Sequence, residues 1–140
     1  MKPMAITTTV GLLTLGLGCV GLFDPRMVVG FVGFDMASAS HVPAALSEVR
    51  AVYGGLFTVI GAFTLLAAHS PASHRTQILF IGLLWLGLCG GRLLGVWIDG
   101  SPGLKGWLCA AFELAMGLAL LITLWAEPLS SAGAETERTA

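Results

Sequence analysis

Charged residues are scarce in this chain of 140 residues: they make up 11% of the sequence, and the formal net charge is -1. Soluble domains carry about 25% charged residues, so this chain has too few to cover a water-facing surface. The chain also lacks the basic field that holds a nucleic-acid backbone. The composition therefore excludes an ordinary soluble enzyme and a nucleic-acid-binding protein.

Side chains that bind metals or carry out nucleophilic chemistry are few and scattered. They comprise three cysteines and three histidines: Cys19, Cys89, Cys109, His41, His69 and His74. The cysteines lie singly inside apolar stretches and form no CxxC pair, and the histidines fall in predicted loops or at helix ends. No spacing fits a zinc site or inward-facing haem ligands. The sequence therefore predicts no metal site and no catalytic residue, and it identifies no cofactor.

What the sequence does have is apolar length, with 56% hydrophobic residues and a mean hydropathy of +0.87. Four apolar stretches stand out, at about 5–23, 49–68, 77–98 and 106–125. A bilayer core of about 30 Å is crossed by roughly 20 helical residues, and backbone in lipid must satisfy its own hydrogen bonds. We therefore predict an all-α integral membrane four-helix bundle of up-down-up-down topology. It would form a single domain over 1–129, followed by a disordered polar tail at 130–140.

The first predicted loop, 24–47, is long and only partly polar. Its apolar part, 27–34, is too short to cross a membrane. This part could lie at the membrane interface, fold back as a cap over the bundle, or simply connect two spans.

Membrane orientation rests on a small difference in loop charge. Four spans place both termini on one side, together with Lys2, Arg75 and Arg138, whereas Arg26 and Lys105 lie on the other side. Cytoplasmic loops carry an excess of Lys and Arg, so the count of three against two favours both termini in the cytoplasm.

Two opposite charges fall inside predicted spans. Arg92 lies about six residues before the end of the third span, and Glu113 about seven residues after the start of the fourth. At a rise of 1.5 Å per residue, both are ~10 Å below the same membrane surface. A charge at such a depth costs several kcal/mol unless it is paired or hydrated. Arg92 and Glu113 are therefore predicted to lie close together.

Further polar residues come from helix ends on that same side of the membrane. They are Glu48, Arg50, Tyr53 and Asp99. One interpretation is a ligand-binding pocket in one leaflet, with Arg92 and Glu113 at its floor and these four residues at its mouth. The other is an Arg92–Glu113 ion pair that only fixes the register of two helices.

Glycines mark the faces on which helices could approach closely. Gly87, Gly91 and Gly95 repeat every four residues along the third span, a pattern typical of close helix packing in membranes. Glycines of the second span predict the same, namely Gly54, Gly55 and Gly61. Any of these faces could also form a homodimer.

The string S-E-V-R-A-V-Y-G-G at 47–55 is the most distinctive in the chain. Together with Gly91-Arg92, Asp99-Gly100 and Glu113, it resembles a family of small bacterial four-span membrane proteins known as a domain of unknown function. The resemblance extends from about 5 to 125. The chain is also similar in architecture to DoxX-like four-span proteins.

The resemblance implies a bundle in the bacterial inner membrane and no particular reaction. The positions that match the family pattern are Glu48, Arg50, Tyr53, Gly54, Gly55, Arg92, Asp99 and Glu113. The charged residues among them are the same ones that the argument from membrane depth places toward one surface.

The leading functional hypothesis is a multi-pass, non-enzymatic membrane protein whose polar pocket binds a lipid, a quinone or another amphiphile. An accessory subunit or assembly factor of a larger membrane complex is the alternative. A small dimeric transporter is less well supported, because the first span carries no carboxylate. A membrane enzyme is less well supported too, because no nucleophile is identified. The expected partners are the lipid bilayer, an amphiphilic ligand, and a second copy of the chain or a larger complex.

Overall fold

The computed structural model describes residues 3–34 and 41–126, and throughout these ranges the regular structure is helical. The helices are α1 (Pro3–Phe23), α2 (Pro25–Val32), α3 (Val42–Val49), the π-helix η1 (Arg50–Leu56), α4 (Phe57–His69), α5 (Arg75–Asp99) and α6 (Gly103–Ala126). Helices α3, η1 and α4 follow one another without a break. The prediction of an all-α four-helix bundle is confirmed, whereas the predicted tail at 130–140 lies outside the described residues.

Four segments are long and apolar enough to cross a membrane: Pro3–Phe23, Val42–His69, Arg75–Asp99 and Gly103–Trp125. The second begins at Val42, several residues before its expected start at about 49. Pro43 lies in the first turn of α3, where a proline is tolerated, and the helix then continues past the charged residues Glu48 and Arg50.

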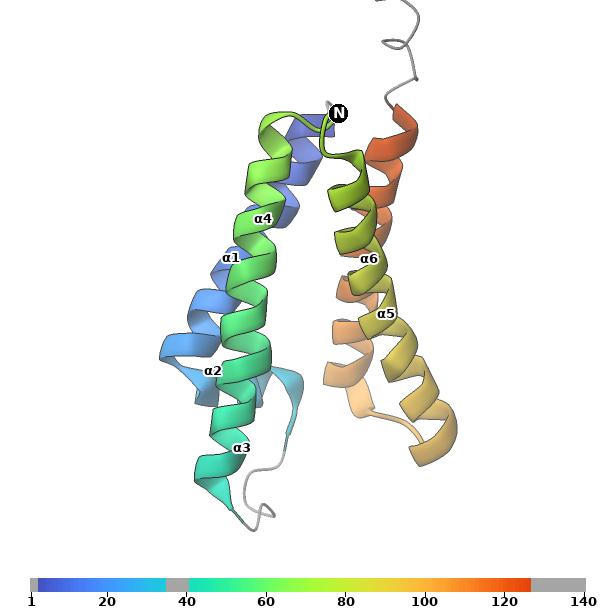
Figure 1. Cartoon of the computed structure of the whole chain (residues 1–140). Helices are drawn as coiled ribbons and strands as arrows, with labels where there is room; N and C mark the ends of the chain where they lie inside the picture. Colours follow the sequence, from blue (N-terminus) through green and yellow to red (C-terminus); the bar gives the residue numbers. More distant parts are fainter. Residues whose placement is uncertain (1–2, 35–40, 127–140) are drawn as a thin grey trace, which may run out of the picture.

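The bundle is made of two helix pairs. Figure 1 shows α1 beside α4 and α5 beside α6. Glycines permit the close approach of α1 to α4: a Cβ at Gly18 would lie 2.4 Å from the Thr58 backbone nitrogen, and a Cβ at Gly61 would lie 2.4 Å from that of Leu15. No side chain fits at these positions without moving one helix away from the other.

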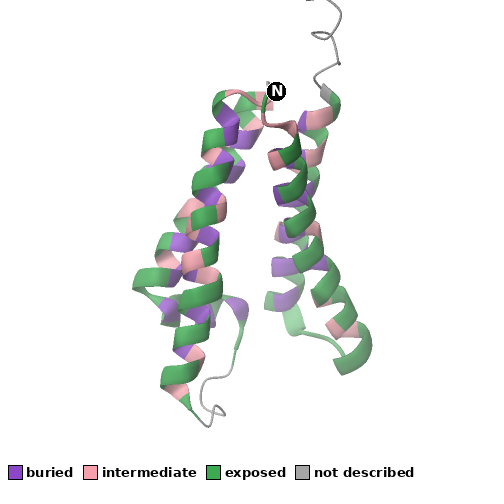
Figure 2. Cartoon of the chain, viewed as in Figure 1, coloured by how far each residue is buried: buried purple, intermediate pink, exposed green. Residues whose placement is uncertain are grey.

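A shared core joins the two pairs. It includes buried residues of all four long helices: Val10, Phe57, Ala67, Ile78, Ile81, Trp85, Met116 and Leu120. Large apolar side chains are also exposed on the outer faces, among them Leu12, Phe63, Phe80 and Leu94. Figure 2 shows exposed residues along the outside of every long helix. Such a surface is unsuited to water and suited to lipid, so the chain is a multi-pass membrane protein.

The start of the first loop folds back onto the bundle as α2. Asp24 caps this helix by accepting a hydrogen bond from the Met27 backbone N–H at 3.1 Å, and Gly33 ends it with a left-handed φ of +88°. The valines of α2 are buried against Leu46 and Val49. Helix α2 also contacts α1, η1 and α6. Of the placements left open for this apolar stretch, the structure has it packed against the bundle.

Candidate functional site

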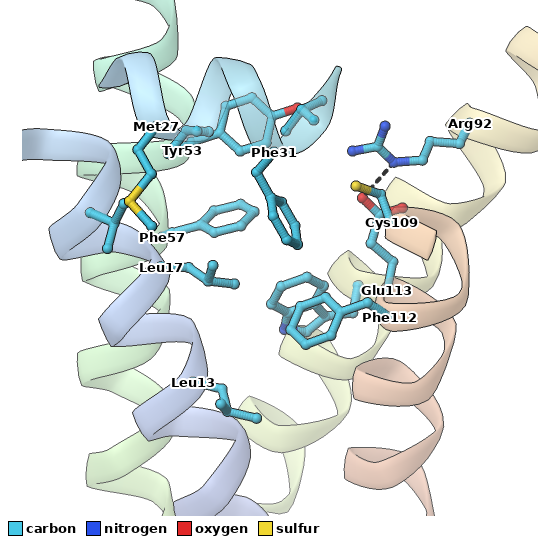
Figure 3. A pocket seen from close by; sticks show the side chains of 14 residues that line it. Leu13, Leu17, Met27, Phe31, Tyr53, Phe57, Arg92, Cys109, Phe112 and Glu113 are labelled. Atoms are coloured by element: carbon cyan, nitrogen blue, oxygen red, sulfur yellow. Dashed lines mark hydrogen bonds and ion pairs between the residues drawn. The ribbon is translucent and has the colours of Figure 1, made fainter. Parts of the chain in front are cut away.

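A cavity of 280 Å³ lies between the two helix pairs. Five elements besides α2 line it, and Figure 3 shows its side chains. The lining residues are Leu13, Leu17 and Val20 of α1; Met27, Val28, Phe31 and Val32 of α2; Tyr53 of η1 and Phe57 of α4; Trp85 and Arg92 of α5; and Cys109, Phe112 and Glu113 of α6. Apart from Arg92 and Glu113, this lining is apolar or aromatic. The cavity is therefore apolar except at these two residues, which form a charged patch.

The charged patch is an ion pair between neighbouring helices. Arg92 Nε donates a hydrogen bond to Glu113 Oε1 at 2.7 Å, as Figure 3 shows. The Arg92 side chain is 23% exposed, whereas that of Glu113 is only 6% exposed. The predicted proximity of these two residues is therefore present in the structure. Arg92 lies about two turns before the end of α5, so the pair is ~10 Å from that end.

The ion pair uses only one oxygen of the carboxylate. Glu113 Oε2 is buried and has no hydrogen-bond partner among the described residues. An arginine fork commonly binds both oxygens of a carboxylate, and here one of them is left open. A buried acceptor without a partner costs about 1–3 kcal/mol, more when it is charged. Glu113, a residue of the cavity lining, therefore carries a buried acceptor with unused capacity.

A second residue of the cavity lining also has a buried polar atom without a hydrogen-bond partner among the described residues. Trp85 Nε1, an N–H donor, is buried without a hydrogen-bond partner in the described part of the chain. A buried tryptophan usually finds an acceptor for this N–H. Two residues of the cavity lining thus carry a buried unmatched atom, an acceptor on Glu113 and a donor on Trp85.

Aromatic rings form the rigid part of the wall. Tyr53 contacts Phe57 with ring centroids 5.6 Å apart, Phe57 contacts Trp85 at 5.3 Å, and Trp85 contacts Phe112 at 5.6 Å. The last two contacts are edge-to-face, a favourable geometry for aromatic pairs. This chain of rings runs from one helix pair to the other and fixes their spacing beside the cavity.

The structure brings together three of the six predicted site residues. Tyr53, Arg92 and Glu113 line the cavity. Figure 3 shows the Tyr53 hydroxyl on the side of its ring that faces Arg92.

The other three predicted site residues do not line the cavity. Glu48 is exposed on α3, and Asp99 is exposed in the last turn of α5, about two turns beyond Arg92. Arg50 is exposed, and its Nε donates to the Leu22 carbonyl at the end of α1 at 3.3 Å. Sequence position alone placed these residues at one end of the bundle but could not give the direction of their side chains.

The predicted packing glycines of the second span differ in whether another helix lies close to them. A Cβ at Gly54 would lie 2.8 Å from the Leu22 backbone nitrogen, so Gly54, like Gly61, lies at a close approach to α1. At Gly55 a Cβ would reach only the Arg50 carbonyl of the same helical segment, at 3.8 Å.

The predicted glycine stripe of the third span does not lie at a helix contact in the described part of the chain. A Cβ at Gly87 or Gly91 would meet nothing within 4 Å, and one at Gly95 would meet only Asp99 of its own helix, at 3.9 Å. Helix α5 approaches α6 at a different place, where a Cβ at Gly117 would lie 3.0 Å from the Gly82 carbonyl.

Sequence reasoning missed most of the apolar lining, including Phe57, Trp85 and Phe112. A signal was present for Trp85, because it lies in the middle of its span rather than near an interface, where tryptophans of membrane proteins usually gather. No comparable signal existed for Met27 and Phe31, because their place in the lining depends on how the first loop folds back.

Residues 4–124 match the family described as domain of unknown function DUF4345. The chain belongs to the DUF4345 family. No curated protein and no solved structure matches it.

The DUF4345 description gives no activity, so the chemistry of this member must be argued from the cavity. Within residues 3–34 and 41–126, no group of three or more His, Cys, Asp or Glu side chains is placed to hold a metal ion. The cavity offers one ion pair, two unmatched polar atoms and an apolar wall. This combination can bind a molecule that is apolar over most of its length and polar at one point.

Proposed function

We propose that this multi-pass membrane protein is a binding protein for an amphiphilic ligand, such as a lipid or a quinone, and that it resides in the bacterial inner membrane with both termini in the cytoplasm. The observation that carries the proposal is the apolar cavity whose wall contains the half-satisfied Glu113 carboxylate beside Arg92. The ligand's polar head would lie at these two residues. Its apolar part would lie along α1, α2 and the aromatic rings.

The size and lining of the cavity support binding of part of such a ligand. Small-molecule pockets usually measure about 300–1,000 Å³ and are mostly apolar with a few placed polar groups. The cavity, at 280 Å³, lies just below this range. It would therefore hold a ring or the first part of a chain, with the remainder in the surrounding lipid.

The alternative, an ion pair that serves only to fix helix register, does not explain why one carboxylate oxygen of Glu113 is left without a hydrogen bond in the described part of the chain. Such a pair is most stable when further hydrogen bonds satisfy the remaining atoms of both groups. Glu113 Oε2 has no such bond among the described residues, although the carboxylate is almost fully buried. A ligand that donates to Oε2 would remove this cost.

Native mass spectrometry on protein extracted gently from its own membrane tests the proposal. We expect a reproducible extra mass of lipid or quinone size on the wild-type chain. The same mass should be absent from an Arg92→Leu, Glu113→Leu double variant, in which the polar patch is removed. A matched Glu48→Gln, Arg50→Gln double variant changes the same residue types outside the cavity and should keep the mass. Equal retention by all three proteins would contradict the proposal.

A second candidate function is supported by a different surface. Gly87, Gly90 and Gly91 are exposed on α5 and face no other helix in the described part of the chain. Exposed small residues at this spacing favour close contact with another membrane helix. An accessory subunit of a larger complex, or a homodimer, would use this face. If so, Gly91→Leu should remove a co-purifying subunit and leave any small bound mass in place.

A further inference from the structure

We infer that the ligand head is uncharged and carries a hydroxyl group, so the cavity selects an alcohol-type amphiphile over a fatty acid, an alkylamine or a phospholipid. This inference rests on the proposed binding of an amphiphile in the cavity. It follows from the net charge of the polar patch and from its unmatched donor and acceptor.

The net charge of the patch argues against a charged head. Arg92 and Glu113 are joined at 2.7 Å, so their formal charges already cancel. An anionic head near Arg92 would also face the Glu113 carboxylate, and a cationic head near Glu113 would also face the guanidinium. Either head would bring an uncompensated charge to membrane depth, where an unpaired charge is unfavourable.

The unmatched atoms argue for a hydroxyl rather than any uncharged head. Glu113 Oε2 requires a donor, and Trp85 Nε1 requires an acceptor. A hydroxyl both donates and accepts, so it can donate to Glu113 Oε2 or accept from Trp85 Nε1. A ketone or an ether only accepts and would leave the buried carboxylate oxygen unmatched, so of the quinone-type ligands the reduced dihydroxy form fits and the oxidised form does not.

Trp85 also provides a direct readout of cavity occupancy. It is 2% exposed and lines the cavity, whereas the other three tryptophans, Trp97, Trp107 and Trp125, are exposed on the surface. A variant with Trp97→Phe, Trp107→Phe and Trp125→Phe keeps Trp85 alone. A bromine on the ligand chain quenches tryptophan at short range, so a probe held in the cavity against Trp85 quenches it more strongly than one dissolved in the bilayer outside the helices.

The experiment compares four probes on the single-tryptophan protein in lipid nanodiscs. All share a 6-bromohexyl chain, short enough to keep the bromine inside the cavity when the head lies at the ion pair, and end in a hydroxyl, a methyl ether, a sulfate or a trimethylammonium group. We expect the alcohol to quench Trp85 at a concentration about tenfold below that of the other three, because each of these leaves a buried group unmatched or adds a charge.

Each other outcome is decisive. Quenching by the sulfate or the ammonium probe at equal or lower concentration would overturn the uncharged head and leave the proposed amphiphile binding intact. Quenching by the methyl ether equal to that by the alcohol would overturn the donor requirement. Failure of all four probes to quench Trp85 would overturn the proposed function together with the inference.

Two variants test whether the ion pair itself sets the selectivity. Glu113→Gln keeps the size of the side chain and leaves the Arg92 charge unopposed, so preference should move toward the sulfate. Arg92→Gln should move it toward the ammonium. Glu48→Gln, outside the cavity, should keep the order of the wild type. An unchanged order in both cavity variants would overturn the inference, and if a variant fails to fold, the wild-type order still decides it.

Discussion

Lys105 Nζ, in the first turn of α6, donates a hydrogen bond to the Gly30 carbonyl of α2 at 2.7 Å. These two residues are 75 positions apart, and their bond fastens α2 to the helix pair opposite the one from which it emerges. Met27 and Phe31 of the same helix line the cavity. Helix α2 is thus a cavity wall held partly by a single exposed lysine.

Replacing Lys105 should increase local opening of α2 while lowering the stability of the whole protein only slightly. Lys105→Met keeps most of the aliphatic chain that lies near Gly33 and removes the donor. The lost bond is exposed, so the expected cost in global stability is about 0.5 kcal/mol. Hydrogen exchange of backbone amides in 25–34 should speed up in nanodiscs, with little change in α5. Lys105→Arg, which keeps a donor, is the control. Unchanged protection of α2 in Lys105→Met would show that the bond does not hold the wall.

The two halves of the ion pair should differ in their effect on stability. Arg92→Leu leaves the almost fully buried Glu113 carboxylate without a partner, for which about 3–5 kcal/mol is the usual cost. Glu113→Leu leaves Arg92, whose longer and more exposed side chain can turn toward the membrane surface, so its cost should be smaller. The double Leu variant should be more stable than Arg92→Leu alone. Unfolding midpoints in matched detergent check this order, and equal midpoints for the two single variants would contradict it.

Glycines on the two helix pairs should respond with opposite signs to the same substitution. Gly61→Ala places a Cβ 2.4 Å from the Leu15 backbone nitrogen, so α1 and α4 must separate and stability should fall by at least 1 kcal/mol. Gly87→Ala meets nothing within 4 Å in the described structure, and alanine is the better helix former by about 0.5–1 kcal/mol. Stability of the isolated chain should therefore be unchanged or higher. Destabilisation by Gly87→Ala would indicate that this face packs against another subunit.

The parts of the fold that followed from the sequence are those set by hydrophobic length. Four long apolar segments in lipid have to be helices, and the opposite charges Arg92 and Glu113 had to lie close together because each is costly alone. Depth along a helix can be counted in residues, so the pair was predictable. The direction of a side chain around the helix depends on packing. Arg50 and Asp99 lie at the same end of the bundle as the ion pair but outside the cavity for this reason.

The glycine pattern shows the same limit on α5. The regular repeat of Gly87, Gly91 and Gly95 is the more conspicuous signal, yet the α5–α6 approach occurs near Gly82 and Gly117. Spacing identifies a face on which a helix can come close. It does not identify which neighbour, if any, occupies that face.

Trp85→Phe should separate the binding role of Trp85 from its packing role. Phenylalanine keeps a ring between Phe57 and Phe112 and removes the unmatched N–H. The smaller ring leaves a small void, whereas loss of a buried unpaired donor is favourable, so the net change in unfolding free energy should stay within about 1 kcal/mol. If Nε1 binds the ligand head, the fraction of chains that retain the bound mass in native mass spectra should nevertheless fall severalfold. Trp107→Phe, which removes an exposed indole N–H outside the cavity, is the control and should keep the mass. Full retention by Trp85→Phe would show that the indole only packs in the cavity wall. Of the two unmatched atoms, Glu113 Oε2 alone would then recognise the ligand head.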